Sequence, residues 1–312
     1  MTAVLLALLA ALAYGASDFF GGSLSRRFHY LPVVFLANTS TVLLLAVAVP
    51  FAPGSGLSRA AAGWALVAGL GGGGGGLALY RGLARGRMAV VGPVSAVGAA
   101  LLPVVVGPAL GERLSLLAGI GVALALPAIW LVSGGGLPAV LRRGIAAAPG
   151  HSGAGRQPAL TAGLADAVVA GVGFGFLFIG LERTGEESGL WPVLISQAVP
   201  ILLVTVLVAA RPRPARRYVP APGAQPRTVE SVLDLWSLGI GWAAVPGVLL
   251  AVAVVCYRIA ARDGMAVAAV LTSLYPAVTV LLAAALLGER VERTQLAGLS
   301  LSLAAVAAIA AG

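Results

Sequence analysis

The chain has 312 residues, of which 59% are hydrophobic and 10% charged, and its mean hydropathy is +1.00. A soluble domain carries about 25% charged residues, so this chain lacks the polar surface that a soluble globule needs, and it is too apolar to stay disordered. The composition therefore excludes a soluble enzyme and a disordered protein, and it predicts an integral membrane protein.

The excess of basic residues has two interpretations. All 20 basic residues are arginine, they outnumber 11 acidic residues, and the net charge is +9. A basic chain can bind nucleic acid. These arginines, however, stand in short clusters between apolar runs, which is typical of residues that set membrane topology. We therefore expect the lipid bilayer as their partner, and no nucleic acid.

Continuous apolar runs follow one another along the chain. A helix that crosses a bilayer needs about 20 mostly apolar residues, whereas a barrel strand needs about 10 of alternating polarity. The runs show no such alternation, so we expect an all-α membrane protein with ten transmembrane helices. In chain order the predicted helices are 2–23, 32–51, 62–81, 88–110, 114–133, 160–181, 189–209, 236–257, 265–287 and 295–311.

The first run is similar to a secretory signal peptide, because Ala11-Leu12-Ala13 resembles a cleavage site. A signal peptide begins with a basic segment, and no basic residue precedes this run. We therefore expect the run to be retained as the first transmembrane helix.

Two longer segments separate the apolar runs. Residues 134–159 are rich in glycine, proline and alanine, which predicts a linker. Residues 210–232 hold five arginines and several prolines, which predicts a basic loop that lies against lipid headgroups.

An internal repeat relates the two halves of the chain. Residues 80–113 and 257–290 align without a gap at an offset of 177. The two segments share Tyr-Arg at their starts, Met-Ala-Val near their middles and Gly-Glu-Arg at their ends. Shared composition does not easily produce these matches at one fixed offset, so we infer a duplication. We expect the Gly-Glu-Arg turns to be structural, with each glutamate favouring the start of the next helix.

The duplication gives each half five helices, and an odd number makes the second half enter the membrane in the opposite orientation. We therefore expect two inverted repeats, 1–133 and 160–312, joined by the linker 134–159. Inverted repeats are typical of secondary transporters, in which the two halves rock about a site near the middle of the membrane.

Two five-helix halves, each with a Gly-Glu-Arg turn after its fourth helix, resemble the EamA-type transporters of the drug/metabolite transporter superfamily. The segment Tyr14-Gly15-Ala16-Ser17-Asp18-Phe19 is also similar to the first-helix motif of such proteins. The resemblance implies ten helices, a central cavity between the halves, and export or exchange of small metabolites. It implies no single substrate, because members of the family differ widely.

Charged side chains inside a bilayer cost several kcal/mol unless they are paired or hydrated, so they are candidates for function. Asp18 is the main one, and Tyr14 lies one turn earlier on the same helix face. Asp18 has two interpretations. It is a functional site that couples transport to protons or holds an ammonium group, or it is an interfacial carboxylate that pairs with Arg26 or Arg27. Asp166 lies closer to the start of the sixth helix, where a carboxylate stabilises the helix N-terminus.

Uncharged polar residues within the predicted helices are weaker candidates. Asn38 and Gln197 lie at nearly equivalent places in the second and seventh helices, where their amides either bind a polar ligand or hold helices together. The hydroxyls of Ser95 and Thr272 can also bond to the backbone of their own helix.

Aromatic residues and prolines within the helices have several interpretations. Phe174 either lines an apolar pocket or packs against neighbouring helices or lipid, and Tyr275 is a further candidate for the substrate path. Pro246 and Pro276 are expected to kink the eighth and ninth helices.

Six successive glycines, Gly71, Gly72, Gly73, Gly74, Gly75 and Gly76, lie in the third helix. They do not form a phosphate-binding loop, because no lysine followed by serine or threonine comes after them. They allow either close packing on a neighbouring helix or a flexible cavity wall.

The sequence shows no catalytic constellation, no ATP-binding motif and a single cysteine, so we expect no enzyme, metal or cofactor. We predict a multi-pass secondary transporter of the plasma or inner membrane that exports small organic metabolites, amino-acid-like or drug-like, by alternating access. Protons are a candidate coupling ion. The alternative is a non-transporting membrane subunit or a lipid-modifying membrane protein. The sequence does not indicate an oligomeric state.

The arginine count and the family resemblance predict opposite orientations. The odd-numbered loops hold 15 arginines and the even-numbered loops hold 5. Because arginine is enriched in cytoplasmic loops, this count predicts that both termini lie outside. The resemblance implies that both termini lie inside, so the orientation stays open.

Overall fold

A computed structural model describes residues 1–27, 30–52, 54, 56–85, 88–132, 157–210, 241–287 and 291–311 of the chain. Within these residues the regular secondary structure is helical throughout, and no strand occurs. The predicted all-α class is therefore confirmed. Most of the predicted linker 134–159, and the basic loop from residue 211 onward, lie outside the described residues.

Helices occupy all the apolar runs that the sequence contains, although their ends differ from the predicted ones. They are α1 (Thr2–Arg27), α2 (Tyr30–Ala48), the short 3-10 helix η1 (Val49–Phe51), α3 (Arg59–Arg85), α4 (Met88–Ala109), α5 (Leu116–Val132), α7 (Gln157–Arg183), α8 (Trp191–Ala209), α10 (Gly241–Ala260), α11 (Met265–Thr272), α12 (Tyr275–Leu287) and α13 (Arg293–Ala311).

Among the described residues, six stretches of helix are long and apolar enough to cross a membrane. They are Thr2–Ser25, Tyr30–Phe51, Arg59–Gly82, Ala165–Arg183, Trp191–Ala209 and Met265–Leu286. Shorter apolar helices lie at Val94–Ala109, Leu116–Val132, Ala244–Ala260 and Arg293–Ile309. These lengths support a multi-pass membrane protein, and the count of ten spans stays a prediction.

The kink predicted at Pro276 takes the form of a break between α11 and α12. Proline has no N–H to donate to the carbonyl of Thr272, and its ring crowds that carbonyl, so a continuous helix is unfavourable there. The chain makes a turn instead, in which the N–H of Leu274 donates to the carbonyl of Leu271 at 3.2 Å. The break brings Tyr275 to the start of a new helix.

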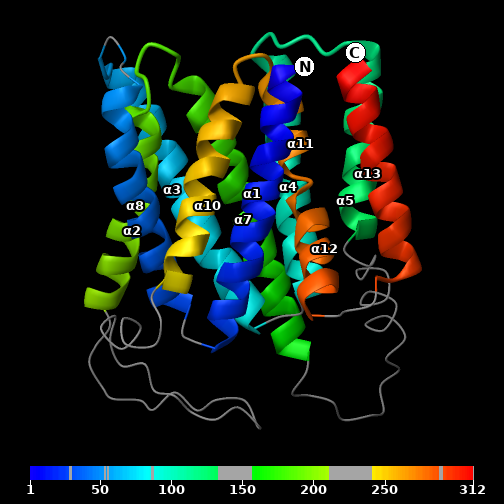
Figure 1. Cartoon of the computed structure of the whole chain (residues 1–312), viewed down its shortest axis with the longest axis horizontal. Helices are drawn as coiled ribbons and strands as arrows, with labels where there is room; N and C mark the ends of the chain where they lie inside the picture. The colour runs from blue at the N-terminus through cyan, green and yellow to red at the C-terminus, as the bar shows by residue number, and fades with distance from the viewer. Residues whose placement is uncertain are drawn as a thin grey trace.

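The helices run side by side along one direction, and both chain termini lie at the same end of the bundle (Figure 1). Helices α5 and α13 pack against each other at one edge, and α2 and α8 pack together at the other. Between these edges, α3 packs against α7 and α8, while α10 packs against α1 and α2. Contacts between the N-terminal and C-terminal parts of the chain therefore form the centre of the bundle.

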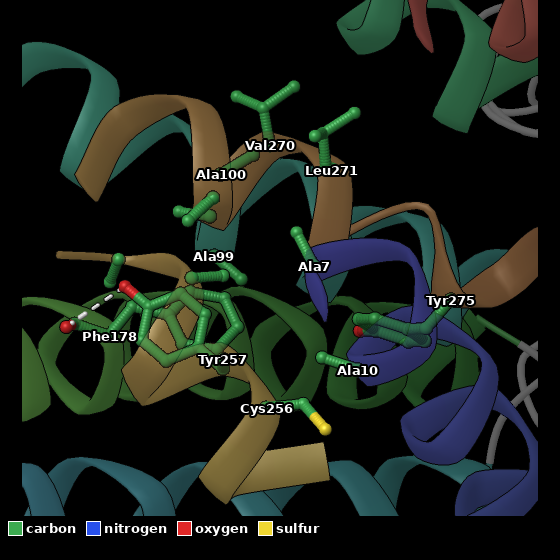
Figure 2. Close-up of a cluster of buried hydrophobic side chains, with 14 of the residues drawn as sticks. Ala7, Ala10, Ala99, Ala100, Phe178, Cys256, Tyr257, Val270, Leu271 and Tyr275 are labelled. Carbon is green, nitrogen blue, oxygen red and sulfur yellow. Dashed lines mark hydrogen bonds between the residues drawn. The ribbon is translucent and has the colours of Figure 1, made fainter. Parts of the chain in front are cut away.

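Small side chains allow these helices to approach closely. Figure 2 shows a buried cluster in which Ala7 and Ala10 of α1, Ala99 of α4 and the rings of Phe178 and Tyr257 lie near one another. Small residues bring helix backbones within van der Waals contact, which is the main attraction between helices in a lipid environment.

The glycine run of α3 packs closely on α7. A Cβ added at Gly71 would lie 2.5 Å from the carbonyl oxygen of Gly173, and one added at Gly75 would lie 3.0 Å from the carbonyl oxygen of Ala170. A Cβ added at Gly74 would meet no atom within 4 Å. The expectation of close helix packing therefore holds for part of the run but not for every position.

Alanine substitutions test this packing. Gly173→Ala is expected to lower the free energy of unfolding by about 1–3 kcal/mol, because the added methyl group overlaps the backbone of α3. Gly74→Ala is the matched control, since it fills open space and replaces a poor helix former; its stability should be unchanged or up to about 1 kcal/mol higher. Thermal unfolding of detergent-purified protein measures both. Equal midpoints for the two variants would contradict close packing of α3 on α7.

Candidate functional site

A cavity of about 70 Å³ lies between the N-terminal and C-terminal parts of the chain. Helices α1, α2 and α3 line it from the N-terminal part, and α7, α8, α10 and α12 line it from the C-terminal part. A water molecule needs roughly 10–15 Å³ of such space, so the cavity has room for several waters or for part of a small organic molecule.

Asp18 of α1 lines this cavity and is half-buried. Among the lining residues that the structure describes, it is the one charged side chain. The alternative in which Asp18 pairs with Arg26 or Arg27 concerns side chains outside the described residues. Asp18 therefore gives the described cavity a negative charge that no described lining residue balances.

The amides predicted from the sequence both line the cavity, from α2 and α8. The Nδ2 group of Asn38 donates to the carbonyl of Val34 at 2.9 Å, so it is held by its own helix. The Nε2 atom of Gln197 is buried and has no hydrogen-bond partner among the described residues. An unpartnered buried donor costs about 1–3 kcal/mol, which favours a water or ligand acceptor beside Gln197.

Aromatic rings form much of the remaining wall. Tyr14 and Phe178 contact each other edge to face, with ring centroids 6.3 Å apart, and the hydroxyl of Tyr14 is buried without a partner among the described residues. Phe174, Tyr80 and Tyr275 complete the aromatic lining. The cavity thus combines a carboxylate, two amides and apolar ring faces.

The structure places the two predicted hydroxyl residues outside the cavity lining. Ser95 is fully buried, and its hydroxyl donates to the carbonyl of Gly92 at 2.7 Å and lies 3.0 Å from the hydroxyl of Tyr275. Because the Ser95 hydroxyl donates its one proton to the carbonyl of Gly92 in its own helix, the hydroxyl of Tyr275 is the donor to Ser95. Thr272 is also fully buried and donates to the carbonyl of Ala7 at 3.4 Å. These two hydroxyls connect helices behind the wall.

The glycine run also contributes to the wall, through Gly72, Gly73 and Gly76. A Cβ added at Gly73 would lie 2.9 Å from Cδ1 of Leu203, whereas one added at Gly76 would meet no atom within 4 Å. Both roles expected of this run, helix packing and cavity wall, therefore occur, and Gly73 has both.

Most of the predicted site residues meet in the cavity, but several lining residues were not predicted. Tyr80 and Phe178 line it, although the sequence marked Tyr80 only as part of the repeat. Ser17 lines it as well, and its hydroxyl donates to the carbonyl of Pro246 at 2.9 Å. The signal available in the sequence was that Ser17 precedes Asp18 and that Tyr80 precedes Arg81, which the structure shows in an ion pair with Asp166.

That ion pair corrects the expectation for Asp166. Helix α7 begins at Gln157, so Asp166 lies beyond its first turn and cannot act on the helix N-terminus. Its carboxylate instead accepts hydrogen bonds from Nε and Nη2 of Arg81, at 3.0 and 2.5 Å. The pair joins α3 to α7 and neutralises Arg81 outside the cavity lining.

The first Gly-Glu-Arg turn is structural, but in a different way from the one expected. Glu112 accepts the N–H of Ala266 with both carboxylate oxygens, at 3.1 and 3.2 Å. It therefore caps the N-terminus of α11 in the other half of the chain, not the helix that follows it. The second such turn lies outside the described residues.

Beyond the cavity, Tyr257 of α10 is fully buried and stacks on Phe178 at a centroid distance of 4.3 Å. Its hydroxyl donates to the carbonyl of Phe178 at 3.0 Å (Figure 2). Its repeat counterpart, Tyr80 of α3, lies against Gly21 of α1, where an added Cβ would overlap the Tyr80 hydroxyl. Each tyrosine therefore packs against the first helix of its own half of the chain.

The N-terminal part of the chain, residues 1–134, matches the family model of the EamA-like transporter family. This part is an EamA-like transporter domain. The match agrees with the resemblance of the chain to the drug/metabolite transporter superfamily.

Solved structures extend the likeness to the whole chain. Ten chains of solved structures match, and one is titled "Crystal structure of protein". It has a TM-score of 0.63 and 17% identity, and the alignment covers 98% of this chain and 95% of that one. At this identity the likeness shows a shared fold alone. No curated protein matches the EamA-like chain.

Cysteine labelling tests whether the cavity admits water. Cys256 is the single cysteine, so Cys256→Ala gives a cysteine-free background. In this background Asn38→Cys should react with a small water-soluble thiol reagent, because position 38 lines the cavity. Ala99→Cys, at a fully buried position, should react about tenfold more slowly or less, since reactivity follows thiolate access. Equal rates at the two positions would contradict a water-accessible cavity.

Proposed function

We propose that this EamA-like protein is a secondary transporter that moves a small organic molecule by alternating access, with the central cavity as its substrate site. The two moving units are residues 1–133 and 160–312, joined by 134–159 and inverted relative to each other. The carrying observation is that helices of both halves line one cavity, in which Gln197 and Tyr14 hold buried polar atoms without described partners. Such atoms favour a polar ligand or water.

The pattern of helix contacts supports the inversion. With the repeat pairing α1 to α7, α2 to α8 and α3 to α10, every central contact has its counterpart. Helix α3 packs on α7 and α8, and α10 packs on α1 and α2. The pairs α2 with α8 and α5 with α13 join helices that are each other's counterparts. A pseudo-two-fold axis produces this reciprocity.

Individual residues show the same reciprocity. A Cβ added at Gly69 of α3 would meet the carbonyl oxygen of Ser196, and one added at Gly247 of α10 would meet the carbonyl oxygen of Ala37. Ser196 directly precedes Gln197, and Ala37 directly precedes Asn38. The two amides therefore occupy equivalent places, which supports their proposed role as paired substrate ligands.

The repeat-related tyrosines also support the inverted arrangement. Tyr80 and Tyr257 lie near the C-terminal ends of α3 and α10, which run in opposite directions through the bundle (Figure 1). Each contacts the first helix of its own half, Tyr80 at Gly21 of α1 and Tyr257 at Phe178 of α7. The two contacts are therefore counterparts at opposite ends of the bundle, as an inverted repeat requires.

A non-transporting subunit or a lipid-modifying protein is the rival function. Such a protein needs no polar cavity between the two halves of its chain. The presence of that cavity, with its unpartnered polar atoms, favours transport over both alternatives. We further propose that Asp18 takes part in coupling to protons, because a lining carboxyl can bind and release one proton in each cycle.

Repeat-related positions test the inversion. Ser115 and Glu292 are 177 residues apart, the offset of the repeat, and both are exposed. With Cys256→Ala as the background, an impermeant maleimide added to intact cells should label one of Ser115→Cys and Glu292→Cys and spare the other. Inside-out vesicles should reverse the pattern. Labelling of both from the same side would overturn the inverted arrangement.

A metabolite-export screen tests transport. Cells that express the protein should release at least one small organic compound faster than cells without it. Asp18→Asn should lower that release about tenfold or more, because it removes the charge of the cavity. Glu186→Gln is the matched control, since Glu186 is exposed and pairs only weakly with Arg262 at 3.4 Å.

Membrane levels of each variant, measured by detergent size-exclusion, separate loss of transport from loss of folding. If expression of the protein raises the release of no compound, that result counts against the transport function. Release that is unchanged in Asp18→Asn would count against the role of Asp18 alone.

A further inference from the structure

We infer that the cavity selects a small organic ammonium cation with an apolar body, and rejects zwitterions such as amino acids. This inference deepens the proposed function, because it takes the cavity as the substrate site. It narrows the predicted substrates, which are amino-acid-like or drug-like metabolites, to organic cations.

The charge of the cavity carries the inference. Among its described lining residues Asp18 is the one carboxyl group, no basic side chain lines the cavity beside it, and it has no described salt-bridge partner. Two described arginines near helix ends are engaged elsewhere. Arg81 pairs with Asp166, and Arg258 donates to the carbonyl of Gly185 at 2.6 Å. A carboxylate in low-dielectric surroundings attracts a positive ligand strongly.

The aromatic wall strengthens the preference for an organic cation. Tyr14, Tyr80 and Tyr275 line the same cavity as Asp18. Phe174 and Phe178 add two more ring faces to the lining. Ring faces attract ammonium groups and also accommodate apolar substituents, whereas a hydrated inorganic ion gains little from them.

The unpartnered polar atoms indicate where the rest of the ligand binds. The Nε2 atom of Gln197 is a buried donor, so it suits an oxygen acceptor on the ligand, such as a hydroxyl or carbonyl. The hydroxyl of Tyr14, one helical turn from Asp18, can accept a hydrogen bond from an ammonium N–H. These atoms orient the ligand, and Asp18 supplies the attraction.

A zwitterion fits this lining poorly. The carboxylate of an amino acid would share the cavity with Asp18, and the described lining offers it no arginine, lysine or histidine. Two like charges in a low-dielectric space repel, and burying a carboxylate without a partner is costly. An amine without that carboxylate avoids both penalties.

Three probes of matched shape test this selection by direct binding. They are phenethylamine, which is cationic, phenylalanine, which adds a carboxylate, and 2-phenylethanol, which is neutral. Isothermal titration calorimetry on detergent-purified full-length protein measures their affinities. Benzyltrimethylammonium is a second cation, which tests whether an N–H donor is needed. We expect at least one of the two cations to bind about tenfold or more tightly than both phenylalanine and 2-phenylethanol.

The variants locate the site. Asp18→Asn should weaken cation binding about tenfold or more, while Glu186→Gln, which also removes one carboxylate, should leave it unchanged. If Asp18→Asn does not fold, the comparison of probes on the unaltered protein still tests whether the cavity selects cations. Cations that bind no better than 2-phenylethanol, or phenylalanine that binds as tightly as phenethylamine, overturn the inference.

The binding measurement and the export screen distinguish failure of the inference from failure of the transport function. Selective cation binding without any released compound in the export screen would remove the transport function and keep the cation site. A released compound that is zwitterionic or anionic, together with no selective cation binding, would keep transport and remove the inference.

Discussion

The close approach of α3 and α7 is the constraint on which the rest of the structure depends. Gly71 and Gly173 face each other with no side chain between them, so the two halves of the chain meet backbone to backbone. The helix face that makes this contact cannot carry side chains without separating the halves. The same glycine run then reaches the cavity at Gly76, where nothing fills the space that a side chain would take. Packing and cavity therefore depend on one stretch of sequence, because glycine permits both.

A second constraint is electrostatic. Inside a bilayer a charge is stable only when it is paired, hydrated or neutralised, and two described acidic residues find a partner within the protein. Asp166 pairs with Arg81, and Glu112 caps the N-terminus of α11. Asp18 differs because it lines a cavity and has no described ion-pair partner. A protein that keeps a carboxylate in such a place leaves its neutralisation to a water, a proton or a ligand.

Much of the fold and part of the site could be predicted from the sequence, for physical reasons. Apolar runs of bilayer length can form only helices, so the helical class followed from composition and length. Polar side chains are rare within such runs, so Asp18, Asn38 and Gln197 were visible as cavity candidates. Ser95 could not be placed, because a hydroxyl is satisfied equally well by its own helix. Tyr80 was missed, because a ring at a helix end is equally suited to lipid, to packing and to a cavity wall.

The two constraints combine in the transport cycle that we propose. When the halves rock, the helix contacts around the cavity change, but Asp18 stays on α1 within the lining, and its charge needs compensation on both sides of the membrane. A bound organic cation compensates it on one side. When that cation leaves into water, a proton can take its place on the carboxylate, and the return of the empty carrier is then no longer opposed by an uncompensated charge. Because one carboxylate cannot hold both partners, substrate cation and proton compete for it. Selection of a cation and exchange against a proton are thus two consequences of one lone carboxylate, and neither requires a second ionisable group in the cavity.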